Sequence, residues 1–74
     1  LHREHMNYLS VLVESGQCGL SAISSKLGID SDVVAGTIEP ILMRLRLIDR
    51  TRSGRILTEA GKKYVRKGEK VGTS

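Results

Sequence analysis

The sequence lacks most of the residues that usually stabilise so short a chain. It has no Phe, no Trp and only two Tyr among its 74 residues, so an aliphatic core of Leu, Ile, Val and Met is expected. Its single cysteine, Cys18, cannot form an internal disulfide, and this usage is typical of the reducing cytoplasm. No apolar run approaches the ~20 residues of a membrane span. The chain is therefore expected to be one domain, held together by packing alone and without a membrane-spanning segment.

Basic residues are scarce in the first part of the chain and abundant in the second. Residues 1–43 contain two basic and five acidic residues, a net charge of −3. Residues 44–74 contain ten basic and three acidic residues, a net charge of +7, which gives the overall +4. Such an asymmetry makes a polyanion the first partner to consider, although a basic half can also be a solvated surface.

Apolar residues at helical spacing predict a first helix over residues 3–14, which Gly16 would end as a left-handed cap. Its buried face is expected to carry Met6, Leu9, Leu12 and Val13. A short second helix follows, with Ser21 as its N-cap and Gly28 as its stop signal. The apolar residues of this second helix are Ile23 and Leu27.

A third and longer helix is predicted over residues 30–46, with Asp30 or Ser31 as its N-cap. Its apolar stripe consists of Val34, Ile38, Leu42 and Leu45. Pro40 inside this helix would crowd the carbonyl of Gly36 and remove one backbone hydrogen bond. We therefore expect a kink near residues 36–40 rather than a break.

Two short strand candidates, residues 47–51 and 55–58, are joined by the loop Arg52-Ser53-Gly54, which predicts a β-hairpin. A short last helix begins at Thr58-Glu59, with Ala60, Tyr64 and Val65 on its buried side. The domain is expected to span residues 1–67, followed by a disordered tail over residues 68–74. The predicted fold is mainly α: a winged helix-turn-helix with a three-helix core, a two-stranded β-hairpin wing and a short C-terminal helix.

The predicted wing carries three arginines, Arg50, Arg52 and Arg55, beside Ser53 and Gly54. The planar guanidinium suits phosphate oxygens and a narrow minor groove, and Gly54 would allow close backbone approach. The third helix begins instead with acidic residues and has no base-reading Arg, Lys, Asn or Gln before its end. The pattern therefore favours sequence-independent, salt-sensitive binding of double-stranded DNA through the wing. The candidate DNA-binding residues are Arg50, Arg52, Ser53, Arg55, Arg46 and Lys62. A turn that is merely solvated and protects the hairpin edge is the alternative.

Residues 37–61, TIEPILMRLRLIDRTRSGRILTEAG, resemble the C-terminal domain of the RuvB family, the bacterial Holliday-junction branch-migration motors. Glu39-Pro40 and Leu42 match the family's Glu-Pro-Tyr-Leu stretch, and Arg50-Thr51, Gly54-Arg55 and Thr58 match its Arg-Thr-Pro-Arg-Gly-Arg and the Thr beyond. Residues 19–34 resemble the family's Gly-Leu…Leu-Gly segment in order and spacing. The sequence departs from the family pattern at four positions, Ile41, Arg46, Arg52 and Ser53, where tyrosine, glycine, proline and arginine are usual.

The resemblance implies that this chain is the DNA-contacting end of a ring ATPase, a helicase of recombination and repair. Its implied partners are duplex DNA and the Holliday junction, and the parent would be a hexameric ring with a junction-binding partner protein. ATP and Mg²⁺ would bind in preceding domains of the parent, because this chain has no Gly-x-x-x-x-Gly-Lys-Ser/Thr phosphate loop. The chain opens without Met and is expected to be a monomeric, cytoplasmic fragment that has no cofactor of its own.

No constellation of residues predicts catalysis or metal binding in the chain itself. His2 and His5 are three residues apart but have no matched third ligand, so we expect both on the surface. Cys18 has no activating base beside it and is interpreted as a structural or unreactive thiol rather than a nucleophile. Glu39 is expected to face solvent as a neighbour of Ile38, with no second carboxylate placed beside it.

The two tyrosines, the last helix and the class of the domain each allow more than one interpretation. Tyr8 and Tyr64 could stack on bases, but packing at the edge of the core is the preferred interpretation. The basic last helix either adds contacts to the DNA backbone or is simply solvated. The whole domain is alternatively a transcription regulator that reads a specific site through residues 30–46, or a winged helix used only for protein contacts.

Overall fold

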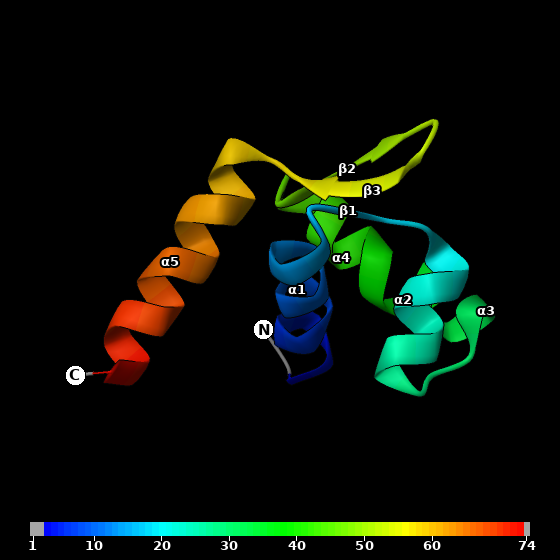
Figure 1. The fold of residues 1–74 in the computed structure, drawn as a ribbon, viewed down its shortest axis with the longest axis horizontal. Helices are drawn as coiled ribbons and strands as arrows, with labels where there is room; N and C mark the ends of the chain where they lie inside the picture. Colours follow the sequence, from blue (N-terminus) through cyan, green and yellow to red (C-terminus); the bar gives the residue numbers. More distant parts are fainter. Residues whose placement is uncertain (1–2, 74) are drawn as a thin grey trace.

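The computed structural model describes residues 3–73, and side chains as far as residue 66. Its elements are α1 (Arg3–Ser15), β1 (Gln17–Cys18), α2 (Leu20–Leu27), α3 (Ser31–Val33), the π-helix η1 (Val34–Ile38), α4 (Glu39–Arg44), β2 (Ile48–Thr51), β3 (Gly54–Leu57) and α5 (Glu59–Thr73). The predicted order of a helix, a short helix, a longer helix, a hairpin and a last helix is confirmed. In Figure 1 the β2–β3 hairpin runs along the top of the view, where its turn rises above α2, and α5 descends on the left.

The first two helices end as their glycines predict. Gly16 has a φ of +75° and its N–H donates to the carbonyl of Leu12 at 2.8 Å, which closes α1. Gly28, with a φ of +69°, ends α2 in the same left-handed conformation. The predicted N-cap Ser21 is wrong, because α2 begins at Leu20 and its N-cap is Gly19, two residues before Ser21.

The third helix is continuous but contains a π turn where a kink was expected. Asp30 is its N-cap, and the carboxylate accepts a hydrogen bond from the N–H of Asp32 at 3.3 Å. The N–H of Glu39 donates to the carbonyl of Val34, five residues back rather than four. This wider turn lies immediately before Pro40, which has no N–H and occupies the first turn of α4. The chain thus accommodates the proline by local widening of the helix.

The sheet has three strands in the order β1-β3-β2: the predicted two-stranded hairpin is confirmed as β2–β3, and β1 adds a third strand that the sequence did not predict. The short strand β1 pairs antiparallel with β3 on the side away from β2, with Gln17 opposite Ile56 and Cys18 opposite Arg55. Gly54 makes this approach possible: its φ is +142°, and a Cβ there would lie 2.8 Å from the carbonyl carbon of Cys18. The close approach that this glycine permits is therefore between two strands of the domain itself.

The aliphatic core lies between the three N-terminal helices and the sheet. Its buried apolar residues are Tyr8, Leu9, Leu12, Cys18, Ile23, Val34, Ile38, Leu42, Leu47, Ile48, Leu57 and Val65. Two predicted core residues are wrong, since Val13 is 47% exposed and Leu45, beyond the end of α4, is 50% exposed. On α1 the buried face is rotated toward His5 and Tyr8, so the surface position expected for His5 is also wrong. None of the helices in the described part of the chain is long and apolar enough to cross a membrane.

The last helix is fixed to the domain by its first turn. The Thr58 hydroxyl accepts a hydrogen bond from the N–H of Gly61 at 3.0 Å and donates to the carbonyl of Arg46. Gly61 is buried against the chain at Leu47, whereas the predicted core residue Ala60 is exposed. Only Val65 of the predicted set is buried, because Tyr64 is also on the exposed side.

Helix α5 continues to Thr73, so it is longer than the short helix that the sequence predicts. The expected boundary at residue 67 and the tail over residues 68–74 fall where side chains are not described, and both stay predictions.

Candidate nucleic-acid interface

The tip of the hairpin is a two-residue turn formed by Arg52 and Ser53, both exposed. The Thr51 hydroxyl, just before the turn, donates to the carbonyl of Gly54 at 2.9 Å. It also accepts a hydrogen bond of 3.0 Å from the side-chain amide of Gln17 on β1. The tip is therefore held in place by side chains from the neighbouring strands while Arg52 and Ser53 face solvent.

Two further arginines, one before β2 and one within it, line the same surface beside the hairpin. Arg46 and Arg50 both line a shallow surface hollow between the end of α4 and β2, and both are exposed. Their positively charged groups share this surface with one carboxylate, Asp49, which accepts a hydrogen bond of 2.9 Å from the N–H of Arg50. The structure thus brings two of the candidate residues, Arg46 and Arg50, to the same surface.

The backbone of Arg46 is held in an unusual conformation. Its φ is +60°, in the left-handed region that favours glycine. Glycine is also the usual residue at this position in the RuvB family pattern described above. Its N–H donates to the carbonyl of Met43 at 2.9 Å, and that of Leu47 donates to the carbonyl of Leu42 at 2.9 Å. These two bonds form a Schellman motif at the C-terminus of α4, and this motif requires a residue in the left-handed conformation. An arginine here therefore carries backbone strain of roughly 1 kcal/mol.

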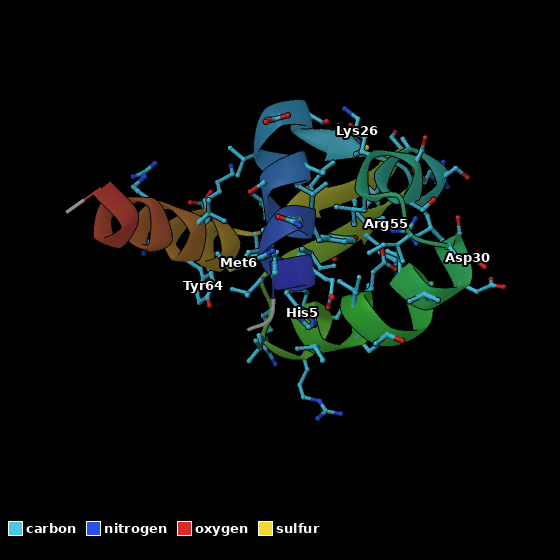
Figure 2. The ribbon with its side chains drawn as sticks, turned by 90° about the horizontal axis from the view of Figure 1, so that it is seen from below. His5, Met6, Lys26, Asp30, Arg55 and Tyr64 are labelled. Atoms are coloured by element: carbon cyan, nitrogen blue, oxygen red, sulfur yellow. The ribbon has the colours of Figure 1, made fainter. Side chains whose placement is uncertain are left out.

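Arg55 does not point to solvent, unlike the other wing arginines. Its Nε donates to Oε2 of Glu39 at 2.8 Å, and its Nη2 donates to Oε1 at 3.3 Å. The arginine side chain is 17% exposed and Glu39 is 2% exposed. Figure 2 shows Arg55 inside the outline of the domain, whereas Lys26 and Asp30 lie at its rim. The expectation that Glu39 faces solvent is therefore wrong.

Tyr8 completes this buried group from the side of α1. Its hydroxyl donates to Oε2 of Glu39 at 2.5 Å, and the ring is fully buried. Burial, followed by the hydrogen bond to the carboxylate of Glu39, raises the pKa of the Tyr8 hydroxyl well above its ordinary value. The same carboxylate, through its hydrogen bond, raises the pKa of Arg55, so this guanidinium stays charged.

Sequence reasoning missed the role of Glu39 because helical spacing in a regular α-helix places it on the exposed side. The π turn before it shifts the residues that follow around the helix axis and brings its side chain inward. The Glu39-Pro40 pair at the start of α4, with arginines downstream, was the signal available in the sequence.

The exposed surface of the third helix differs from the wing in charge. Asp30 and Asp32 lie exposed at its N-terminus, and the described residues from there to Met43 include no Arg or Lys. The first basic residue, Arg44, is in the last turn of α4. This helix therefore presents poor chemistry for phosphates and for guanine or adenine edges, as the sequence predicts.

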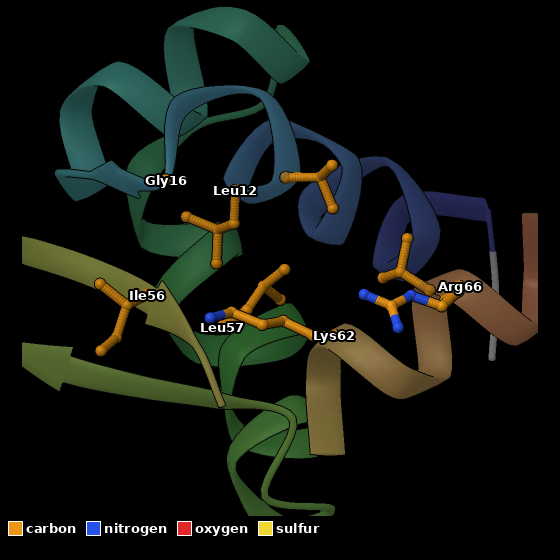
Figure 3. Close-up of a pocket in the computed structure, with 8 residues that line it drawn as sticks. Leu12, Gly16, Ile56, Leu57, Lys62 and Arg66 are labelled. Carbon is orange, nitrogen blue, oxygen red and sulfur yellow. The ribbon is translucent and has the colours of Figure 1, made fainter. Parts of the chain in front are cut away.

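Lys62 lies apart from the other candidate residues. It lines a groove between α1, β3 and α5, together with Leu12, Ile56, Leu57, Val65 and Arg66 (Figure 3). Its ammonium is 3.8 Å from the carboxylate of Glu59, and both side chains are largely exposed. The structure therefore does not group Lys62 with the arginines of the wing.

The described residues contain no group of three or more His, Cys, Asp or Glu placed to hold a metal ion. His5 is buried in α1, Cys18 is buried in β1, and His2 lies outside the described residues.

Three packed helices, followed by a hairpin whose arginine contacts the third of them, define a winged helix-turn-helix domain. The family model of the RuvB C-terminal winged helix domain matches residues 1–66, and the chain belongs to this family. The RuvB subunit of the Holliday junction branch migration complex from Mycoplasma genitalium is 41% identical over 61 residues, 81% of this chain. The corresponding subunit from the Wolbachia of Brugia malayi is 38% identical over 66 residues, 88% of this chain.

The solved structures agree with this assignment. The Thermotoga maritima RuvB Holliday junction branch migration motor matches 89% of this chain with a TM-score of 0.83 and 30% sequence identity. The match covers 23% of that chain, and the curated relatives are covered to 20% of their length. The chain thus spans about a fifth of the length of these relatives.

Proposed function

We propose that this chain binds duplex DNA without sequence preference, as the C-terminal DNA-contacting module of a Holliday-junction branch-migration motor. The observation that carries the proposal is the exposed pair Arg50 and Arg52 on a projecting wing, in a domain of the RuvB family. Each guanidinium can bind phosphate oxygens through two N–H groups, which fixes the register of the duplex but reads no base.

Arg46 and Ser53 extend this surface in the proposal. Arg46 shares its hollow with Arg50, so the two can bind phosphates along the same side of the wing. Ser53 at the tip offers a hydroxyl to the same backbone. Lys62 would make a separate contact from α5, at the groove that this helix forms with α1 and β3. The guanidinium of Arg55 is paired with the carboxylate of Glu39, so Arg55 is not included among the direct DNA contacts.

In the parent protein, ATP and Mg²⁺ would be bound by other domains, and the motor would act in the cytoplasm as a hexameric ring with a junction-binding partner protein. Within that assembly the wing would hold the duplex while the motor domains move it. The family of the chain does not favour the alternative of a transcription regulator, and neither does the acidic start of the third helix.

The test is a titration of labelled random-sequence duplex at low salt, since non-specific affinities are only ~10⁻⁴ to 10⁻⁶ M at physiological salt. The variant Arg50→Ala/Arg52→Ala should bind more weakly than the wild type, and its salt slope should fall by about two units. Arg3→Ala/Lys26→Ala is the matched control, because it removes two exposed positive charges from the acidic part of the chain. Urea unfolding verifies that each variant is folded.

Equal binding by the wing variant and the wild type would refute the proposal. A strong preference for one sequence over random duplex would support the regulator instead.

A further inference from the structure

One hydrogen-bonded network of the wing faces the interior of the domain. Arg55 of β3, Glu39 at the start of α4 and Tyr8 of α1 meet in one hydrogen-bonded group, with the carboxylate at its centre. Both carboxylate oxygens are engaged, Oε2 by Tyr8 and Nε of Arg55, and Oε1 by Nη2 of Arg55. A buried carboxylate that accepts two charge-assisted hydrogen bonds in a fork geometry restricts the arginine to one orientation. This group therefore connects the wing to two helices of the core.

The register of the hairpin explains why Arg55 needs this carboxylate. Arg50 and Arg55 are directly opposite each other in the β2–β3 pair, so their side chains leave the sheet on the same face. Like charges in such a pair repel and destabilise the hairpin. Glu39 neutralises Arg55, so that Arg50 can lie exposed beside it at the edge of the sheet.

We infer that Glu39, Tyr8 and Arg55 are positioning residues for DNA binding: they orient the wing, and Arg55 is not itself a phosphate contact. The inference rests on the proposed function, since it concerns how the same surface is presented. The exposed arginines bind phosphate with little loss of freedom only if the strand that carries them is already fixed. Glu39 supplies that restraint from inside the domain, although it is an acid in a DNA-binding module.

A competing explanation makes the opposite prediction for one substitution. If Arg55 were a phosphate contact, Glu39 would compete with DNA for its guanidinium. Glu39→Gln would then release the arginine, raise the net charge by one and strengthen binding. If Glu39 positions the wing, the same substitution leaves Arg50 and Arg55 facing each other without compensation. Binding then weakens despite the added positive charge.

The experiment measures the affinity of the 74-residue chain for labelled random-sequence duplex at low salt. We expect Glu39→Gln to weaken binding about tenfold, the equivalent of one lost charge-assisted contact. Glu4→Gln is the matched control, because it makes the same charge change at an exposed position on α1. Its affinity should be unchanged or slightly higher.

The double variant Glu39→Gln/Arg55→Gln separates the two roles of the arginine. We expect it to bind no more weakly than Glu39→Gln, because it also removes the repulsion between the two arginines. Tighter binding by Glu39→Gln than by the wild type would overturn the inference. Further weakening in the double variant would also overturn it, since Arg55 would then contact DNA.

Folding is verified for each variant by urea unfolding, and Tyr8→Phe replaces Glu39→Gln if the latter does not fold. A second readout is independent of DNA: ¹⁵N relaxation of the amides of residues 50–55. Loss of order in this hairpin alone is expected in Glu39→Gln, and unchanged order would overturn the inference. If the wild type fails to bind duplex, the proposed function fails, while the relaxation data still decide whether Glu39 orders the wing.

Discussion

The substitution Gly61→Ala should destabilise the domain strongly, although alanine is the better helix former by about 1 kcal/mol. A Cβ at residue 61 would lie 2.0 Å from the carbonyl oxygen of Leu47, whereas real Cβ contacts essentially never fall below 3.0 Å. Helix α5 must therefore move by about an ångström. The obstacle is backbone and cannot rotate aside, and the same oxygen accepts the N–H of Thr58 at 3.1 Å.

The size of the effect follows from the interactions that this movement would break. The Thr58 N–H bond to Leu47 and the Thr58 hydroxyl bond to Arg46 are each worth about 1 kcal/mol. Overpacking typically adds about 1–3 kcal/mol. After the gain in helix propensity, we expect a net loss of about 2–4 kcal/mol, which lowers Tm by roughly 10–30 °C in a domain of this size.

Gly36→Ala is the matched control, because Gly36 is also helical but has no neighbouring atom within 4 Å of a built Cβ. It should stabilise the domain by about 0.5–1 kcal/mol. Both variants and the wild type are compared by urea unfolding, followed by circular dichroism at 222 nm. If Gly61→Ala is as stable as Gly36→Ala, α5 does not pack against Leu47 as described, and the reasoning fails.

Three other predictions concern the buried network, the strained cap and the wing. Tyr8→Phe should cost about 2 kcal/mol at pH 7 through loss of a bond to a charged group. Because the folded state raises the pKa of Tyr8, this contribution is complete below about pH 10 and falls by about 1.4 kcal/mol per pH unit above it. The free energies of unfolding of the two proteins should therefore converge at about pH 11.5. Arg46→Gly should relieve the strain at φ +60°, but glycine also increases the conformational entropy of the unfolded chain, which offsets part of this gain. The free energy of unfolding should therefore rise by about 0.5 kcal/mol. The same variant should bind duplex with a salt slope lower by about one unit, and unchanged binding would remove Arg46 from the interface. Arg52→Ala alone should leave Tm within a few degrees and lower the salt slope by about one unit, because its exposed side chain contributes little to folding.

Most of the helical framework could be predicted from local patterns. Gly16 is a left-handed cap as predicted, Gly28 ends the second helix where predicted, and Asp30 is the N-cap of the third helix. These signals are local, because each depends on the conformation of one residue and on hydrogen bonds within a single turn.

The errors arose where a residue is placed by contacts with a distant part of the chain. Strand β1 has only two residues and no alternating pattern, and it exists because β3 offers its free edge. Ala60 was expected in the core by spacing, but the close approach of Leu47 selects Gly61 for that side. Tyr8 was placed at the edge of the core, since nothing local indicates that a carboxylate 31 residues away accepts a hydrogen bond from its hydroxyl.

The sequence by itself determined the class of the domain, its charge asymmetry and the arginine-rich turn, because periodicity, caps and composition are carried by neighbouring residues. Only the tertiary structure decided what each arginine does. Arg50, Arg52 and Arg55 look equivalent in the chain, and strand pairing places Arg50 and Arg55 on the same face of the sheet, but Arg55, unlike the exposed Arg50, lies against the third helix. There Glu39, brought inward by a π turn that widens the helix beside Pro40, neutralises it. The reason is physical: the environment of a charged group depends on what surrounds it in space, and that is set by the folded chain.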